Sequence, residues 1–189
     1  MLPLDLTLGN RSLSILCLGA HSDDIEIGAG ATLLELAKRF PDAVIRWVVL
    51  SAAGERESEA RHSAKQFLAD FSNGTLDLSN FRDGYFPSQW SELKSKFEEL
   101  KRACDPHVIF THYRDDRHQD HRTVSDLTWQ TFRNHLILEY EIPKYDGDLG
   151  LPNLFCPVSE EYAELKATRL EKCFASQHKH SWFTRETFL

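Results

Sequence analysis

The chain has 189 residues, a length that suits one domain with a substantial hydrophobic core. Hydrophobic residues make up 41% and charged residues 27% of it, and the net charge of −7 argues against a nucleic-acid binder, which needs a basic face. No stretch approaches the roughly 20 apolar residues of a membrane span, and no signal peptide is evident. The four cysteines lie far apart, as expected for free thiols in a reducing cytoplasm.

Short apolar runs alternate with helical patterns along the chain. Four runs predict strands, at 12–19, 43–51, 107–111 and 136–142. Helical patterns cover 30–40, 57–71, 91–104, 121–133 and 160–177. This alternation indicates parallel strands with right-handed crossovers, so we expect one α/β domain over 1–189, with a mostly parallel sheet and helices on both faces. Asn73 and Gly74 are interpreted as a turn.

Polar residues follow the first predicted strand abruptly. In "LCLGAHSDDIEIGAG" (16–30), the apolar run stops at His21, and Asp23 and Asp24 come directly after Ser22. Ligands of open α/β sheets bind beyond the carboxyl ends of the strands, which is where this segment belongs. A carboxylate at a helix N-terminus has an ordinary explanation as an N-cap, but that accounts for only one of these groups.

A second polar cluster follows the third predicted strand. In "THYRDDRHQDHRTVS" (111–125), His118, Asp120 and His121 fall within four positions, and His112, Asp115 and Asp116 come just before them. If the two strands are near neighbours, the two clusters converge at one edge of the sheet.

Converging clusters would bring His21, Asp24 and His121 to a single point. Two imidazoles and one carboxylate, with one position left open, form a ligand set for catalytic zinc. Asp116 and Asp120 are placed to accept the second ring N–H of a histidine, which metal-binding histidines generally require.

These residues resemble a known family. "AHSDDIE" resembles the AHPDD(E) signature of the PIG-L/LmbE-like zinc N-deacetylases, and "HQDH" resembles their second signature, HPDH; Ser22 stands where the family has Pro. The segments "GERESEA", "YEIPKYDGDLGLPNLF" and "KATRLEKCFASQHKHSWF" are also similar, so the resemblance covers nearly the whole chain. It implies a Rossmann-like fold. Because relatives usually continue past the position of Leu189, it also implies shortened or missing C-terminal elements.

The resemblance further implies an activity and a cofactor. It implies that Zn²⁺ is held by His21, Asp24 and His121, and that a zinc-bound water attacks the amide with Asp23 as general base. The reaction would remove an N-acetyl group from an N-acetylated sugar or sugar conjugate.

The remaining roles implied by the resemblance belong to residues around the zinc. A protonated His118 would stabilise the oxyanion, with Asp120 orienting the ring. Arg56 would contact the substrate. His112 ends the third strand and is expected either to line the substrate pocket or to support the ligands from behind.

Aromatic residues in the loop after residue 84 are candidates for one wall of the substrate cleft. Tyr85, Phe86 and Trp90 are expected to stack on a sugar ring there.

Two other functions stay open at this point. Strand-end aspartates also hold Mg²⁺ or Mn²⁺ in metal-dependent phosphoesterases, which act on small phosphorylated substrates. A nucleotide-binding module without catalysis is the other alternative, although two carboxylates stand where its phosphate would bind. For the leading interpretation we expect a small-molecule partner, no nucleic acid, a cytoplasmic location and a chain compatible with homo-oligomers.

Overall fold

The computed structural model describes residues 6, 8, 9 and 11–189. Within these residues one five-stranded sheet has the order β3-β2-β1-β4-β5, and every pair of neighbouring strands is parallel. The strands are β1 (Ser14–Gly19), β2 (Val44–Val49), β3 (Asn73–Leu78), β4 (Val108–His112) and β5 (Leu136–Tyr140). The expected α/β fold with a parallel sheet is confirmed.

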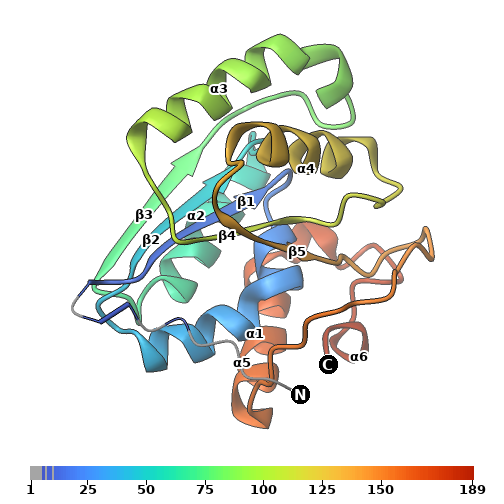
Figure 1. Ribbon diagram of the computed structural model, residues 1–189. Helices are drawn as coiled ribbons and strands as arrows, with labels where there is room; N and C mark the ends of the chain where they lie inside the picture. The colour runs from blue at the N-terminus through green and yellow to red at the C-terminus, as the bar shows by residue number, and fades with distance from the viewer. Residues whose placement is uncertain (1–5, 7, 10) are drawn as a thin grey trace.

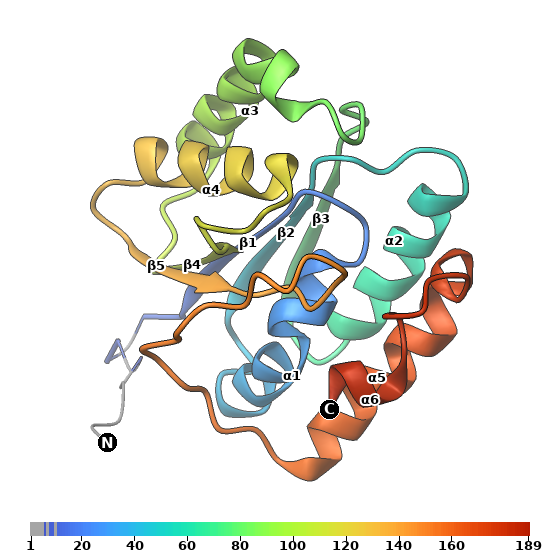
Figure 2. The same ribbon diagram turned by 90° about the vertical axis from the view of Figure 1, so that its right-hand side faces the viewer.

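Helices cover both faces of the sheet. They are α1 (Asp24–Arg39), α2 (Glu55–Phe67), α3 (Trp90–Ala103), α4 (Gln119–Thr131), α5 (Glu160–Cys173) and α6 (Arg185–Phe188), with 3₁₀ turns η1 (Phe86–Gln89) and η2 (Ala175–Gln177). Figures 1 and 2 show α3 and α4 on one face and α1, α2 and α5 on the other. None of the described helices combines the length and the apolar character needed to cross a membrane.

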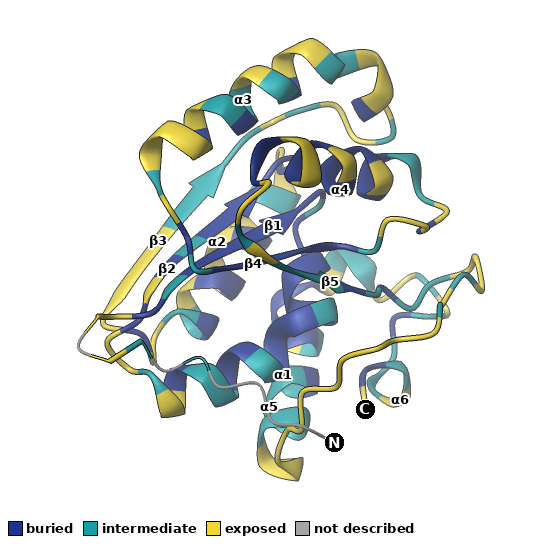
Figure 3. Cartoon of the chain, in the orientation of Figure 1, coloured by how far each residue is buried: buried dark blue, intermediate teal, exposed yellow. Residues whose placement is uncertain are grey.

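The central strand β1 divides the core in two. Ile15 and Cys17 belong to the cluster on the α1 side, whereas Leu16 and Leu18 belong to the cluster on the α4 side. This split follows from the two-residue period of a strand, in which successive side chains point to opposite faces. Both faces of β1 are therefore covered, and α1, which also packs against α5, is buried along much of its length (Figure 3).

The strand β3 was not predicted. Its sequence, "NGTLDL", begins with two residues that usually form turns, and its residues are exposed or half-buried because β3 lies at the edge of the sheet. Pairing with β2, from Val44 opposite Asn73 to Val49 opposite Leu78, fixes the segment as a strand. The other edge strand, β5, keeps an apolar sequence, "LILEY", and was predicted, whereas "NGTLDL" has only two apolar residues, so its composition rather than its edge position hid β3.

Several helix boundaries also differ from the prediction by two to six residues, and two of these differences bear on the site. Helix α1 begins at Asp24 rather than Gly30, because Ile25 and Ile27 already face the core from its first turn. The helix expected over 160–177 ends at Cys173 and continues as η2. The early start of α1 puts the acidic segment of the first motif at a helix N-terminus, directly after β1.

Helix α1 approaches β5 so closely that only glycine fits at position 28. A Cβ atom at Gly28 would lie 2.1 Å from the ring of Tyr140, whose hydroxyl donates to the Leu18 carbonyl oxygen at 2.6 Å. Replacing glycine with alanine inside a helix normally stabilises a protein by about 1 kcal/mol. We predict the opposite sign for Gly28→Ala, a loss of about 1–3 kcal/mol by overpacking, measured by chemical denaturation.

The matched control is Thr32→Ala, one turn further along α1 and half-buried. It should change the free energy of unfolding by less than about 0.7 kcal/mol, the range of ordinary helix propensities. A Gly28→Ala variant more stable than the wild type would contradict the close packing of α1 against Tyr140.

Candidate active site

The two polar segments of the sequence meet at the carboxyl edge of the sheet. Strands β1 and β4 are direct neighbours, with Cys17 opposite Phe110, so the turn after β1 and the loop after β4 emerge side by side. His21 Nδ1 lies 3.2 Å from His121 Nε2. The expected convergence is therefore seen in the structure.

Three donor groups face one another at this point. His21 Nδ1 is 3.4 Å from Asp24 Oδ2, and His121 Nε2 is 3.5 Å from Asp24 Oδ1. With bonds of 2.0–2.1 Å, neighbouring ligands of a tetrahedral zinc lie about 3.3 Å apart, which is close to these separations, although the two histidines face different oxygens of Asp24. Ligand atoms of His21, His118 and His121, and of Asp24, His112 and His121, also lie within 4.8 Å of one another.

Carboxylates hold the outward nitrogen of each ring. His21 Nε2 faces Asp83 Oδ1 at 3.1 Å and Asp120 Oδ2 at 3.3 Å, and His121 Nδ1 faces Asp116 Oδ2 at 2.8 Å. A ring proton is favoured on the nitrogen beside a carboxylate, which leaves the opposite lone pair free. Both free lone pairs, on His21 Nδ1 and His121 Nε2, point toward Asp24.

The same carboxylates favour positive charge between them. Burial by itself lowers the pKa of His21, but Asp24, Asp120 and Asp83 outweigh it and raise the pKa well above the ordinary value. Burial raises the pKa of Asp24, and the neighbouring histidines outweigh that effect and lower it. The electrostatics of this point thus suit a cation.

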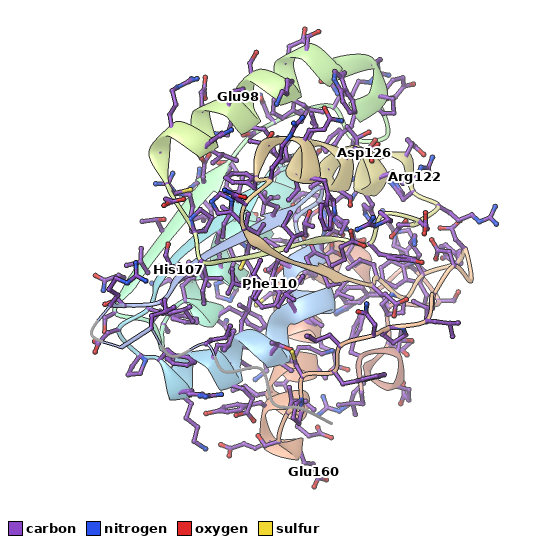
Figure 4. All side chains as sticks on the ribbon, viewed as in Figure 1. Glu98, His107, Phe110, Arg122, Asp126 and Glu160 are labelled. Atoms are coloured by element: carbon purple, nitrogen blue, oxygen red, sulfur yellow. The ribbon has the colours of Figure 1, made fainter. Side chains whose placement is uncertain are left out.

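The loop before α4 is fixed from two sides. Lys144 Nζ contacts Asp116 Oδ1 at 3.0 Å and Asp148 Oδ2 at 2.8 Å. Arg122, labelled on α4 in Figure 4, donates through Nη1 to the carbonyl oxygens of Asp116 and Arg117, at 2.7 and 2.5 Å. Asp116, which orients His121, therefore has little freedom to move.

His112 does not occupy the position expected of a substrate contact. Its side chain is fully buried, and Nε2 accepts from the Ala20 N–H at 3.0 Å and lies 3.2 Å from Asp24 Oδ2. A lone pair engaged by the backbone does not bind a ligand, and burial lowers the pKa of His112 to about 4. His112 therefore does not line the cavity and lies behind Asp24, the second of the two positions expected for it.

Asp120 holds the loop that leads into η1. Its carboxylate accepts from the Gly84 N–H at 2.6 Å and the Phe86 N–H at 3.0 Å, and Gly84 has a φ of +77°, which glycine adopts without strain. The hydrogen bond from Asp120 to His118 comes from the backbone N–H, at 3.3 Å from His118 Nδ1. The carboxylate itself faces His21 rather than orienting His118 in the way the sequence suggested.

His118 caps the N-terminus of α4 and lines the cavity described below. Because Nδ1 accepts from Asp120 N–H, the neutral ring carries its proton on Nε2. Burial, with the nearby rings of His121 and His21, lowers the pKa of His118. The surroundings therefore oppose protonation of His118, and Nε2 is the nitrogen that carries the proton of the neutral ring.

Asp23 is the N-cap residue of α1, but its side chain makes no capping hydrogen bond. Its Oδ1 instead accepts from Arg56 Nη2 at 2.6 Å. Burial raises the pKa of Asp23, Arg56 opposes this, and Asp24 adds to it. The ordinary capping explanation therefore does not account for this carboxylate, which lies 5% exposed beside the three donor groups.

A cavity of about 760 Å³ opens over this point. Its wall is formed by polar and aromatic side chains from the turn after β1, the start of α2, and the loops at 80–83, 142–144 and 176–182. The wall includes His21, Asp23, Asp24, Arg56, Phe81, Asp83, His118, His121, Lys144, Ser176, His180 and Trp182. Catalytic donors and a substrate-sized space thus coincide.

The aromatic wall differs from the one expected. Phe86 is fully buried in the core cluster on the α4 side, and neither Tyr85 nor Trp90 lines the cavity. Phe81 and Trp182 supply aromatic surface instead. The prediction failed because the polar loop turns Phe86 inward when Asp120 binds its backbone N–H.

Four residues of the site were given no role from the sequence: Glu59, Asp83, Lys144 and Trp182. Glu59 stands in the family-like segment "GERESEA", three positions after Arg56, and such pairs share a helix face, but no function was assigned to it. The other three lie in irregular loops whose course the sequence pattern does not indicate.

The fold and site define a class: an α/β protein with a His/Asp site suited to a divalent cation at the carboxyl edge of a parallel sheet. Residues 16–132 match the PIG-L family, described as GlcNAc-PI de-N-acetylase. The chain belongs to this family of deacetylases, which are hydrolases. It is also 32% identical over 178 residues to the uncharacterised deacetylase YaiS of Escherichia coli strain K12, covering 88% of this chain and 94% of that protein.

Solved structures share the fold at low sequence identity. The zinc-inhibited form of the teicoplanin deacetylase Orf2 has a TM-score of 0.69 and 16% identity, covering 87% of this chain and 84% of that one. GalB, the 4-carboxy-2-hydroxymuconate hydratase of Pseudomonas putida KT2440, has a TM-score of 0.66 and 15% identity, covering 93% and 82%. Since a hydratase and a deacetylase share the fold, the fold does not decide the reaction.

Glu26, in the first turn of α1, is fully buried, and burial raises the pKa of its carboxyl to about 8 from 4.5. Between these two values the folded protein keeps the proton while the unfolded chain releases it. The contribution of Glu26 to the free energy of unfolding therefore falls as the pH rises from 4.5 to about 8.

We predict that Glu26→Gln removes this contribution and stabilises the protein at pH 8 relative to the wild type. The measurement is urea denaturation at several pH values, with chelator present so that no bound cation alters the charge balance. Parallel pH profiles of the variant and the wild type between 4.5 and 8 would show that Glu26 is ionised in the folded state.

Proposed function

We propose that this chain is a zinc-dependent hydrolase that removes the N-acetyl group from an N-acetylated sugar or sugar conjugate. The observation that carries the proposal is the orientation of His21 and His121: acidic partners hold their outer nitrogens, and their inner nitrogens converge on Asp24. Membership in a deacetylase family supports the choice of reaction.

His21, Asp24 and His121 would hold the metal ion. A divalent ion bound there supplies Lewis-acid polarisation of the amide carbonyl and makes water more acidic. Two nitrogens and one carboxylate oxygen are a donor set typical of catalytic zinc, which is the ion we propose. One solved structure with this fold is described as the zinc-inhibited form of teicoplanin deacetylase Orf2, so other divalent ions belong in the test.

Asp23 is the proposed general base. It adjoins the metal ligand Asp24, lines the cavity, and is more basic than an exposed aspartate because it is buried. Its carboxylate accepts a proton from the attacking water as the bond to the acetyl carbon forms. Proton transfer of this kind typically contributes about 10²–10⁴-fold to the rate.

His118 is the proposed donor to the developing oxyanion. Its Nδ1 is occupied by the backbone N–H of Asp120, so Nε2–H is the group available to a carbonyl oxygen in the cavity. A donor placed at the oxyanion is worth about 3 kcal/mol in the transition state. A neutral donor is sufficient for this role.

The cavity suits a sugar that carries a further group. Its volume of about 760 Å³ lies within the roughly 300–1,000 Å³ of small-molecule sites. Arg56, Phe81 and Trp182 line it and would contact the sugar or its conjugate. We keep Arg56 as a substrate contact, in addition to its ion pair with Asp23.

The two alternative functions are less well supported. A phosphoesterase with two metals expects mainly oxygen ligands, whereas two of the three converging donors here are imidazole nitrogens. A nucleotide-binding module needs the N-terminus of α1 free for phosphate, and Asp23 and Asp24 stand there. The site therefore favours amide hydrolysis by a metal.

Substitutions of the proposed base and of a proposed metal ligand should separate proton transfer from metal binding. Asp23→Asn should retain the metal and lose about 10²–10⁴-fold in kcat, because the amide keeps an oxygen for Arg56 but does not take a proton from water. His121→Ala should lose both metal and activity, because it removes a donor. Elemental analysis and acetate release from N-acetyl sugars measure the two effects.

Equal metal loss in the two variants would contradict the roles given to Asp23 and His121. Glu57→Gln, on the exposed side of α2, is the control and should match the wild type in both measurements.

Removal of the metal tests the proposed cofactor. Acetate release should stop when a chelator strips the protein and should return when Zn²⁺ is added back in stoichiometric amount. Co²⁺, Mn²⁺ and Mg²⁺ are compared in the same assay, with N-acetylglucosamine and its glycosides as substrates. Full activity in chelator, from protein shown to be metal-free, would exclude the proposed mechanism.

A further inference from the structure

We propose that Glu59 is a positioning residue, which holds Arg56 against Asp23 and at the same time fixes the cavity wall formed by residues 174–182. The inference rests on the proposed function, since it assigns Glu59 a part in orienting the proposed base. Glu59 lies on α2, outside the two sequence motifs; its side chain does not line the cavity, but it binds two residues that do, Arg56 and Ser176.

The Glu59 carboxylate receives three donors. Oε1 accepts from the Ser176 N–H at 2.8 Å, while Oε2 accepts from the Ser176 hydroxyl at 2.7 Å and from Arg56 Nη1 at 3.0 Å. The side chain is 8% exposed. Hydrogen bonds to a charged acceptor with so little solvent contact are strong and directional.

Three contacts hold the Arg56 guanidinium in place. Nη1 is bound to Glu59, Nη2 donates to Asp23 Oδ1 at 2.6 Å, and the guanidinium lies over the ring of the fully buried Phe174, 5.5 Å from its centroid. Glu59 and Asp23 thus share one cation. The position of the Asp23 carboxylate depends on Arg56, and the position of Arg56 depends on Glu59.

The second link of Glu59 reaches a distant part of the chain. Ser176 belongs to η2, 117 residues further on, and the segment after it supplies Gln177, His180 and Trp182 to the cavity. One buried carboxylate therefore sets the distance between the proposed base and the opposite wall.

Only a carboxylate satisfies these three donors. Glutamine has the same size, but one end of its amide is a donor. With its oxygen toward Arg56, its NH₂ would face the Ser176 N–H; with the amide reversed, the NH₂ would face Arg56 Nη1 and the Ser176 hydroxyl. Glu59→Gln is therefore an isosteric change that breaks the arrangement without leaving a cavity.

The test is a kinetic double-mutant cycle with Glu59→Gln and Arg56→Ala, measured by acetate release. Glu59→Gln alone should lower kcat about tenfold or more, the value of a hydrogen bond to a charged group. In the Arg56→Ala background it should have no further effect on kcat, because its action on Asp23 passes through Arg56. The proposal would be overturned if Glu59→Gln lowered kcat by the same factor in both backgrounds, or if it raised KM and left kcat unchanged.

Glu57→Gln is the matched control. It lies on the same helix and pairs with Arg61 at the surface, 2.7 Å from Nη2, so kcat should not change. If Glu59→Gln does not yield folded protein, Ser176→Ala replaces it in the cycle; this variant removes one donor to the carboxylate and should act in the same direction, again only when Arg56 is present.

Crystal structures of the Glu59→Gln and Glu57→Gln variants make the test independent of turnover. If the wild type releases acetate from no substrate, the proposed function fails, while the position of Arg56 still answers the question about Glu59. We expect the Arg56 guanidinium to have left Asp23 in Glu59→Gln and to remain there in Glu57→Gln. A retained contact between Arg56 Nη2 and Asp23 Oδ1 in Glu59→Gln would overturn the proposal.

Discussion

The site depends on the fixed orientation of two imidazole rings. Each ring, at His21 and at His121, has one nitrogen held by a carboxylate and the other directed to a common point beside Asp24. Such an arrangement requires acidic residues behind the rings as well as between them. It also explains why so many carboxylates gather at one edge of a sheet whose two neighbouring central strands, β1 and β4, end there. The acidic groups that look redundant in the sequence each have a separate contact.

The backbone of the site is as constrained as its side chains. Asp24 Oδ2 accepts from the His21 N–H at 2.6 Å, and Asp120 accepts from two N–H groups of the loop that enters η1. Lys144 adds a link from the connection after β5 to Asp116. Loops without regular structure are therefore held by buried charges, which makes the geometry of the donors independent of the flexibility that loops usually have.

Much of the fold and of the site could be predicted because both follow from local patterns. Buried parallel strands are short apolar runs, and polar residues that interrupt such runs at the carboxyl end mark a ligand site, so His21, Asp24 and His121 were found together. The strand β3 could not be found, because "NGTLDL" begins with turn-forming residues and lacks the apolar run that the other edge strand, β5, retains. The sequence left two positions open for His112, because a strand-end histidine has the same sequence signal whether its ring faces the cavity or the core.

The roles of Glu59 and Trp182 could not be predicted from the sequence pattern. Their roles arise from contacts between α2 and the segment after α5, more than 100 positions away, and no periodicity encodes such a contact. Family membership narrows the reaction to deacetylation, but the wall that contacts the substrate is built from these long-range contacts. Specificity within the family is thus expected to vary in the segments that the two motifs do not include.

The central claim is that one divalent ion is bound by residues from both motifs, and anomalous diffraction at the zinc edge from crystals of the zinc-loaded protein tests it most directly. We expect one strong peak about 2.0–2.2 Å from His21 Nδ1, His121 Nε2 and an Asp24 oxygen. A peak bound instead by Asp83 and Asp120 on the outer side of His21, with Asp24 unligated, would contradict the account.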